Sequence, residues 1–132
     1  MNHHYINMKR IITLIILAFS LMCCSTAQNA TYTSLDNSEF AKVIKQKKTQ
    51  IVDVRSTTEY AEGHLPNAIN IDVNNKSFEV IAEKQLKKKK PVAVYCRSGK
   101  RSKIAAGKLA AKGFKVYELD KGIVKWDGEI EK

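Results

Sequence analysis

Cys96 is followed by a short basic segment that could make its thiol a nucleophile. The five residues after it are Arg97, Ser98, Gly99, Lys100 and Arg101. A thiol attacks as its thiolate, and both nearby cations and a helix N-terminus lower the thiol pKa from its ordinary value of about 8.5. We therefore expect Cys96 to be reactive, rather than a buried and inert cysteine.

The residues on either side of this segment predict how it is held. Val92 to Tyr95 is a short apolar run typical of a strand, and a helical run extends from Ser102 to Lys112. A loop between a strand and a helix turns successive backbone N–H groups toward one point, where they can hold an anion or a developing negative charge. The pattern favours attack by a thiolate on an anionic substrate.

The rest of the chain alternates predicted strands and helices. The strands are expected at residues 50–54, 69–71, 92–95 and 116–119. Capping boxes at Asp36 and Glu39, and at Ser56 and Glu59, predict helix starts, and a further helix contains Phe78. This order is typical of an α/β domain with a mostly parallel sheet, whose sites lie at the carboxyl ends of strands. Cys96 falls at such an end.

Apolar spacing predicts which side of each helix faces the core. In the first helix these residues are Phe40, Val43 and Ile44. In the helix after Cys96 they are Ile104, Ala105, Leu109 and Ala110. Gly113 is expected to end that helix.

The N-terminus has the pattern of an export signal. Lys9 and Arg10 precede an apolar run over residues 11–24, which is shorter than the roughly 20 residues of a membrane-spanning helix. A small-x-small pattern follows at residues 25–27. We expect a signal peptide over 1–27, a flexible lead-in over 28–33 and one domain over 34–132. The protein is then periplasmic or secreted.

Cys23 and Cys24 leave a second possibility for the N-terminus. A cysteine after an apolar run can carry the lipid of a bacterial lipoprotein, although neither cysteine follows a Leu-small-small pattern. Contact with a membrane is expected only in that case. Cleavage after Ala27 would instead leave Cys96 as the sole cysteine, which excludes an internal disulfide and a two-cysteine redox cycle.

The chain is strongly basic, with 23 Lys and Arg against 13 Asp and Glu and a formal net charge of +10. This balance suits small anionic substrates. The lysine runs at 42–48 and 84–90 have no interleaved aromatic residues, so we interpret them as solvated surfaces and expect no nucleic-acid partner.

Two separate motifs resemble the rhodanese family, over about Ser34 to Trp126. The first is IVDVR at 51–55, with EY at 59–60 and GHLPNAIN at 63–70; the second is YCRSGKRS at 95–102. Asn67 and Lys121 stand where the family often has glycine. The resemblance implies an α/β fold with a central, mostly parallel five-stranded sheet flanked by helices on both faces.

The resemblance also implies an activity, that of a thiosulfate sulfurtransferase. Cys96 would take the outer sulfur of thiosulfate or a similar donor and pass it to cyanide or a thiol, including one on a thioredoxin-like protein. No metal and no organic cofactor are implied. Related phosphatases of this fold have Cys-x5-Arg, whereas Cys96 and Arg101 form Cys-x4-Arg, a shorter loop that favours sulfur transfer.

Roles for the loop follow from the same resemblance. The backbone N–H groups of 97–101 would hold the outer sulfur, as an oxyanion hole holds oxygen. Arg97, Lys100 and Arg101 would attract the anionic donor, and Ser98 and Gly99 would let the loop curve tightly.

Residues outside the loop are expected to support it. Asp53 and Arg55 have opposite charges at a strand end and are expected to pair with the loop backbone and brace it, in preference to direct contact with the substrate. We expect a hydrogen-bonded structural role for His64, core positions for Tyr95 and Trp126, and a turn at Asn67.

Two other functions remain open at this point. The chain could be a sulfur carrier that exchanges persulfide sulfur with a protein partner and turns over little thiosulfate. It could also be a non-catalytic rhodanese-like binding module, but such modules usually lack the cysteine.

Overall fold

The computed structural model describes residues 31–132, so the expected signal peptide and both N-terminal cysteines lie outside the described residues. Within the described part, the helices are too short and too polar for any of them to cross a membrane.

Five strands form one sheet in which every neighbouring pair is parallel. The strands are β1 (Thr33–Leu35), β2 (Gln50–Asp53), β3 (Ile69–Asn70), β4 (Val92–Tyr95) and β5 (Val116–Leu119), in the spatial order β1-β5-β4-β2-β3. This confirms the predicted five-stranded parallel sheet.

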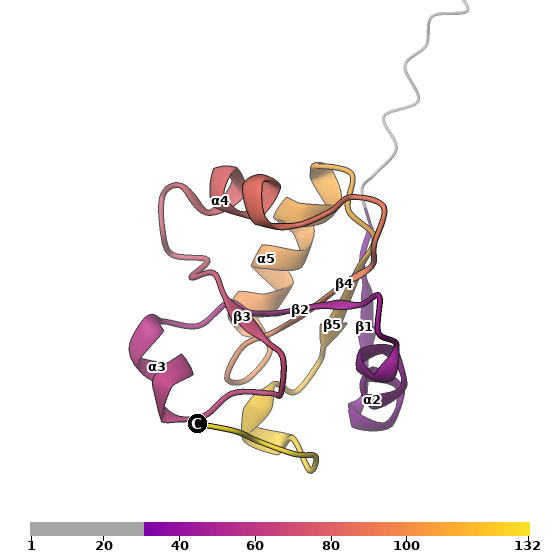
Figure 1. The fold of residues 1–132 in the computed structure, drawn as a ribbon, viewed down its shortest axis with the longest axis vertical. Helices are drawn as coiled ribbons and strands as arrows, with labels where there is room; N and C mark the ends of the chain where they lie inside the picture. Colours follow the sequence, from indigo (N-terminus) through magenta and orange to yellow (C-terminus); the bar gives the residue numbers. More distant parts are fainter. Residues whose placement is uncertain (1–30) are drawn as a thin grey trace, which may run out of the picture.

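Helices cover both faces of the sheet, as predicted. They are α2 (Asn37–Lys45), α3 (Thr57–Glu62), α4 (Phe78–Gln85), α5 (Lys100–Ala111) and the 3-10 helix η1 (Ile123–Lys125). Figure 1 shows α4 and α5 together on one side of the sheet and α2 on the other.

The core is split into two layers by the sheet. Alternate strand residues such as Val52 and Val94 face α4 and α5, whereas Ala93 and Tyr95 face the layer that contains Phe40 of α2. All four residues of β4 are buried, because a central parallel strand is covered on both faces. The strand that leads to Cys96 is therefore fixed from both sides.

At both predicted capping boxes the N-cap side chain makes the expected bond to the third helical residue and sets the helix start. Asp36 accepts a hydrogen bond from the backbone N–H of Glu39 at 2.8 Å. Ser56 accepts one from the N–H of Glu59 at 3.2 Å. Each side chain thereby satisfies a backbone donor that the first turn of a helix leaves free.

Two predictions of local structure are wrong. Thr33, expected in the flexible lead-in, pairs with Tyr117 as the first residue of β1. Ile104, expected to face the core, is 52% exposed. The buried stripe of α5 instead follows Ser102, Ala105 and Leu109, with spacings of three and four residues, and Ile104 lies beside it.

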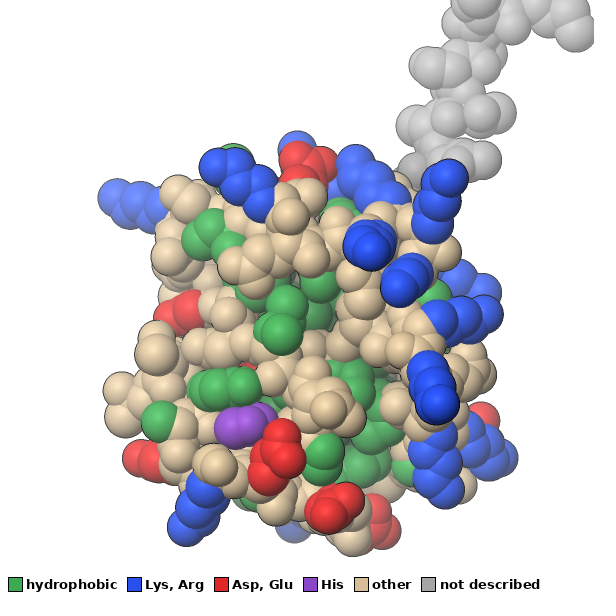
Figure 2. Space-filling view, viewed as in Figure 1, with side chains coloured by type: hydrophobic (Ala, Val, Ile, Leu, Met, Phe, Trp, Pro, Cys, Tyr) green, Lys and Arg blue, Asp and Glu red, His purple; other side chains and the backbone are tan. Residues whose placement is uncertain are grey.

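The two edges of a parallel sheet differ, and the chain uses them differently. Cys96 lies at the carboxyl edge, just after β4. Lysines gather toward the other edge, where a polar cavity of about 430 Å³ is lined by Lys48, Lys88, Lys89, Lys90 and Lys115 with four other residues. Figure 2 shows how densely Lys and Arg side chains populate parts of this surface.

Candidate active site

Cys96 lies in a tight turn that joins β4 directly to α5. The turn ends at Gly99, which precedes the first residue of α5 and has a φ of 98°. This is the predicted arrangement of strand, loop and helix. The helix N-terminus faces the loop, where its free N–H groups favour negative charge.

The sulfur of Cys96 has polar partners inside this turn. The backbone N–H of Gly99 lies 3.1 Å from Sγ, and Ser102 Oγ lies 3.4 Å from it. Burial by itself raises the pKa of the thiol, but hydrogen bonding by Ser102, Gly99 and Ser98 outweighs burial, so the pKa lies below its ordinary value. The site therefore favours a thiolate.

The burial of Cys96 differs from the prediction. Its side chain is only 1% exposed, although it was expected not to be buried. The loop wraps around the sulfur while the side chains of Arg97 and Lys100 remain exposed. Hydrogen bonds, rather than these cations, are the main reason for the lowered pKa of the thiol.

The sequence suggested that Arg101 attracts the anionic donor, but in the structure its guanidinium is paired with a carboxylate. Its guanidinium forms two hydrogen bonds with the carboxylate of Glu59, at 2.7 Å and 2.9 Å. This contact lowers the pKa of Glu59 to about 2. The pair joins α3 to the first turn of α5, so Arg101 acts in holding the loop from the side.

The segment after β5 supports the cysteine loop through backbone hydrogen bonds. Ile123 donates its N–H to Cys96 O at 2.9 Å, and Val124 donates to Arg97 O at 3.0 Å. A Cβ on Gly122, whose φ is 70°, would lie 2.2 Å from Arg97 O, and one on Gly99 would lie 1.9 Å from Asp120 O. Only glycine fits at these two contacts.

Asp53 and Arg55 form an ion pair with each other, and the backbone that Arg55 braces belongs to a different segment from the cysteine loop. Arg55 Nη2 lies 2.6 Å from Asp53 Oδ2 and also 2.6 Å from Gly63 O, at the end of α3. The guanidinium carbon lies 5.8 Å from the centre of the Tyr95 ring. Within the described residues, the pair reaches the cysteine through Tyr95, the residue that precedes it.

The remaining predicted residues have structural contacts. His64 stacks on Tyr60 with ring centres 3.8 Å apart, and its Nδ1 lies 2.9 Å from Tyr60 O. Tyr95 is fully buried, and Trp126 packs edge-on against Phe40. Asn67 has a φ of 65°, as in a turn.

Sequence reasoning missed a polar cluster behind Cys96. Ser102 and Glu118 are fully buried, and Ser102 Oγ lies 2.9 Å from Glu118 Oε1. A signal was present, because Glu118 is a charged residue at an inward position between the core residues Val116 and Leu119. Its partner Ser102 lies 16 positions away and follows only from the fold.

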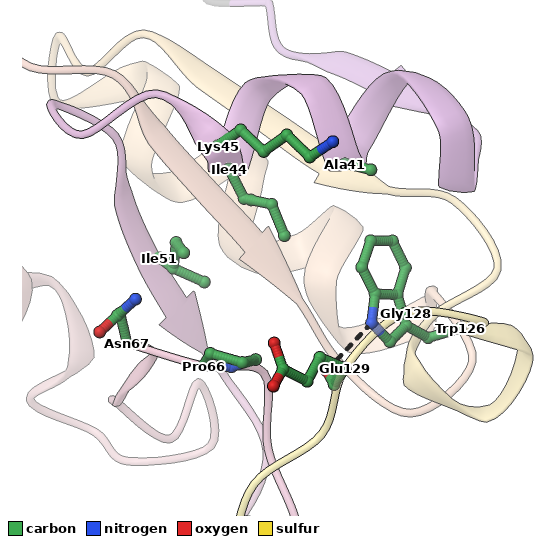
Figure 3. Close-up of a pocket in the computed structure, with 9 residues that line it drawn as sticks. All are labelled: Ala41, Ile44, Lys45, Ile51, Pro66, Asn67, Trp126, Gly128 and Glu129. Atoms are coloured by element: carbon green, nitrogen blue, oxygen red, sulfur yellow. Dashed lines mark hydrogen bonds between the residues drawn. The ribbon is translucent and has the colours of Figure 1, made fainter.

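Other parts of the described surface do not resemble a second catalytic site. Across residues 31–132 there is no cluster of three His, Cys, Asp or Glu side chains that could hold a metal ion. An apolar cavity of about 260 Å³ lies between α2 and the C-terminal segment (Figure 3). There Trp126 Nε1 donates to Glu129 O at 3.4 Å, and Ile44 and Ile51 line the wall.

Comparisons with known proteins agree with this geometry. Residues 36–129 match the family model described as a rhodanese-like domain. The chain is 36% identical over 109 residues to the tRNA uridine(34) hydroxylase of Pelagibacter ubique, covering 81% of this chain and 36% of that protein. It is 39% identical over 85 residues to the tRNA sulfurtransferase of Desulfurococcus amylolyticus, covering 62% and 16%. The chain thus spans about a third or less of these relatives.

Solved structures give the same result at the level of the fold. The BH2092 protein of Bacillus halodurans superposes with a TM-score of 0.66 at 35% identity, covering 75% of this chain and 76% of that one. A rhodanese-related protein of Thermoplasma volcanium superposes with a TM-score of 0.66 at 28% identity, covering 76% and 98%. With the cysteine loop at the carboxyl edge of a parallel sheet and a family match over most of its length, the chain belongs to the rhodanese-like family.

Proposed function

We propose that this protein is a sulfurtransferase that moves sulfane sulfur from thiosulfate, or a similar anionic donor, to cyanide or a thiol acceptor. The observation that carries the proposal is the 3.1 Å contact between the Gly99 N–H and Cys96 Sγ at the start of α5. A backbone donor in this position stabilises negative charge on sulfur without needing a metal or a general base.

The reaction proceeds in two balanced steps. The Cys96 thiolate attacks the outer sulfur of thiosulfate and forms an S–S bond, while the S–S bond of thiosulfate breaks and sulfite leaves with its electron pair. Cyanide then attacks the outer sulfur of the persulfide, which releases thiocyanate and restores the thiolate. Such a covalent intermediate gives ping-pong kinetics.

Each part of the loop contributes to a different stage. The exposed side chains of Arg97 and Lys100 attract the anionic donor. Gly99 N–H and the first turn of α5 stabilise charge as it develops on sulfur. The pair of Arg101 and Glu59 keeps the first turn in place.

Steady-state formation of thiocyanate from thiosulfate and cyanide tests the proposal. We expect saturable turnover with parallel double-reciprocal plots, and its loss in Cys96→Ser. Lys108→Ala, on the exposed side of α5, is the matched control and should keep full activity. Turnover that persists without the cysteine would contradict the proposal.

A second candidate is a sulfur carrier that receives its sulfur from a protein donor. The 1% exposure of Cys96 favours it, because a protein partner could open the loop when it docks. A carrier would take up a persulfide sulfur from a protein donor and show no saturable thiosulfate turnover. The two candidates therefore predict opposite results when thiosulfate is the sole sulfur donor: the enzyme forms thiocyanate from cyanide, and the carrier does not.

We also propose that the chain is exported, because residues 9–27 carry the pattern of a signal peptide. Mass analysis of the processed protein in a bacterial host tests this. A mature N-terminus at Gln28 is expected, whereas a lipid-modified Cys23 or Cys24 would favour the anchored alternative.

A further inference from the structure

A buried carboxylate lies behind the nucleophile, outside the loop that holds the sulfur. Glu118 on β5 is fully buried, as is Ser102 on α5. The Ser102 hydroxyl touches both groups: its Oγ lies 2.9 Å from Glu118 Oε1 and 3.4 Å from Cys96 Sγ. One hydroxyl thus bridges a buried carboxylate and the reactive thiol.

The other partners of Glu118 keep it satisfied as a carboxylate. Ser34 of β1 donates its hydroxyl to Oε2, and Lys103 Nζ of α5 lies 3.1 Å from Oε1. Lys103 also binds Asp120 Oδ1 at 2.8 Å, at the end of β5. An ammonium group and two hydroxyls supply the donors that a buried carboxylate needs.

Glu118 and Cys96 both contact the Ser102 hydroxyl, which has a single proton to donate. A hydroxyl has one proton to donate, and an ionised carboxylate can only accept. Glu118 is a strong acceptor and the nearer one, so the Ser102 hydroxyl points toward Glu118. With its proton on Glu118, the hydroxyl accepts the S–H of the neutral thiol. Ser102 lowers the pKa of Cys96 only when that proton turns to Sγ instead, so Glu118 and the thiolate compete for it.

We propose that Glu118 is a positioning residue for Cys96, which favours the neutral thiol at rest by holding the single proton of Ser102 and by its own negative charge. Gly99 N–H and the first turn of α5 act in the opposite sense. The opposing effects of Gly99 N–H and of Glu118 then set the fraction of Cys96 that is present as thiolate.

The consequence for sulfur transfer rests on the proposed function. When the thiolate takes the outer sulfur and sulfite leaves, the negative charge moves onto the outer sulfur of the persulfide. That atom is one S–S bond, about 2 Å, further along the side chain than Sγ. Glu118 opposes charge on Sγ more than charge on the outer sulfur, so the carboxylate favours the persulfide over the resting thiolate.

The pH dependence of Cys96 alkylation by iodoacetamide tests the proposal directly. In Glu118→Gln, which removes the charge and keeps the shape, the apparent pKa of Cys96 should fall by about one unit, because a like charge is removed from its surroundings. At a pH below the apparent pKa, alkylation should be roughly ten times faster. An unchanged or raised apparent pKa would overturn the proposal.

Asp120→Asn is the matched control for the charge around Lys103. Asp120 shares Lys103 with Glu118 but makes no hydrogen bond with Ser102 among the described contacts. We expect its alkylation profile to stay within about 0.3 units of the unchanged protein. A shift equal to that of Glu118→Gln would show a general charge effect and would also overturn the proposed role of Ser102.

Two further variants isolate the route through Ser102. In a Ser102→Ala background, the shift caused by Glu118→Gln should shrink to about half, because no hydroxyl remains to be reoriented; a full shift would overturn the role of Ser102. If Glu118→Gln fails to fold, Glu118→Asp keeps the charge and draws the carboxylate back from Ser102. It should still lower the apparent pKa of Cys96, and an unchanged value would overturn the proposal. Alkylation needs no sulfur donor, so absence of thiosulfate turnover leaves this test intact.

Discussion

At the scale of single residues, the reactivity of Cys96 comes from where hydrogen bonds reach it rather than from the number of cations nearby. Gly99 N–H approaches the sulfur at 3.1 Å, whereas the Arg101 side chain is engaged by Glu59. A buried thiol would ordinarily resist ionisation, because burial raises its pKa. Hydrogen bonding by the Ser102 side chain and by backbone N–H groups at the start of α5 reverses that direction here.

Gly99 is a position where one added carbon atom should disturb the cysteine loop and its activity. In Gly99→Ala the new Cβ would lie 1.9 Å from Asp120 O at a φ of 98°, so the loop must move and its N–H must leave the sulfur. We expect turnover of thiosulfate to fall roughly 100-fold, as for loss of one oxyanion donor. The apparent pKa of Cys96 should rise in the same variant.

Gly113→Ala is the control variant, because it introduces the same backbone strain at positive φ but no steric clash. Gly113 has a similar φ of 95°, but an added Cβ there meets nothing within 4 Å. It should cost about 1 kcal/mol of unfolding free energy and leave turnover within about twofold. Equal losses of activity in the two variants would mean that the Gly99 contact is not what matters.

At the scale of elements, the short helix α3 contributes by holding the first turn of α5. The contact between Glu59 and Arg101 lowers the pKa of Glu59 from about 4.5 to about 2. A carboxylate whose pKa is lower in the folded protein stabilises the fold above pH 4.5, and this contribution disappears as the pH falls toward 2.

Glu59→Gln should therefore lower the unfolding free energy by about 1 kcal/mol at pH 7, since the pair is bidentate and about three-quarters buried. The difference from the unchanged protein should vanish near pH 2. Urea unfolding at several pH values measures it. Glu83→Gln, which breaks the more exposed pair with Lys88, is the control and should change stability by less than 0.5 kcal/mol. A pH-independent difference at Glu59 would contradict the ion-pair account.

Some elements could be predicted from the sequence and others could not. Local signals were sufficient where one side chain caps a helix, as at Asp36 and Ser56, or where a strand is apolar throughout, as in β4. They failed at β1, because Thr33 and Ser34 have no apolar pattern and become a strand only by pairing with β5. They also missed that Glu59 would engage Arg101, because those residues are 42 positions apart.

At the scale of the whole molecule, the fold separates the nucleophile from the lysine-lined cavity. Parallel strands place every carboxyl end at one edge, where Cys96 lies, and lysines of three loops gather toward the opposite edge. The formal net charge, +10 for the full chain and +8 after removal of residues 1–27 with Lys9 and Arg10, nevertheless acts on any anion that approaches. Long-range attraction of this kind is screened by salt within a Debye length, about 10 Å at 0.1 M.

The net charge predicts a salt effect specific to anionic donors. The kcat/KM for thiosulfate should fall about threefold between 10 mM and 200 mM salt, because screening weakens the attraction of a dianion to a cationic protein. Alkylation of Cys96 by neutral iodoacetamide should be unchanged over the same range. A parallel decline of both rates would indicate a structural effect of salt instead of lost electrostatic attraction.

If Cys96 carries the transferred sulfur, the intact mass of the protein records it. After incubation with thiosulfate, we expect a gain of about 32 Da that is absent in Cys96→Ala and is removed by cyanide, as covalent catalysis requires. A protein that forms thiocyanate without any gain of mass at Cys96 would contradict the persulfide mechanism.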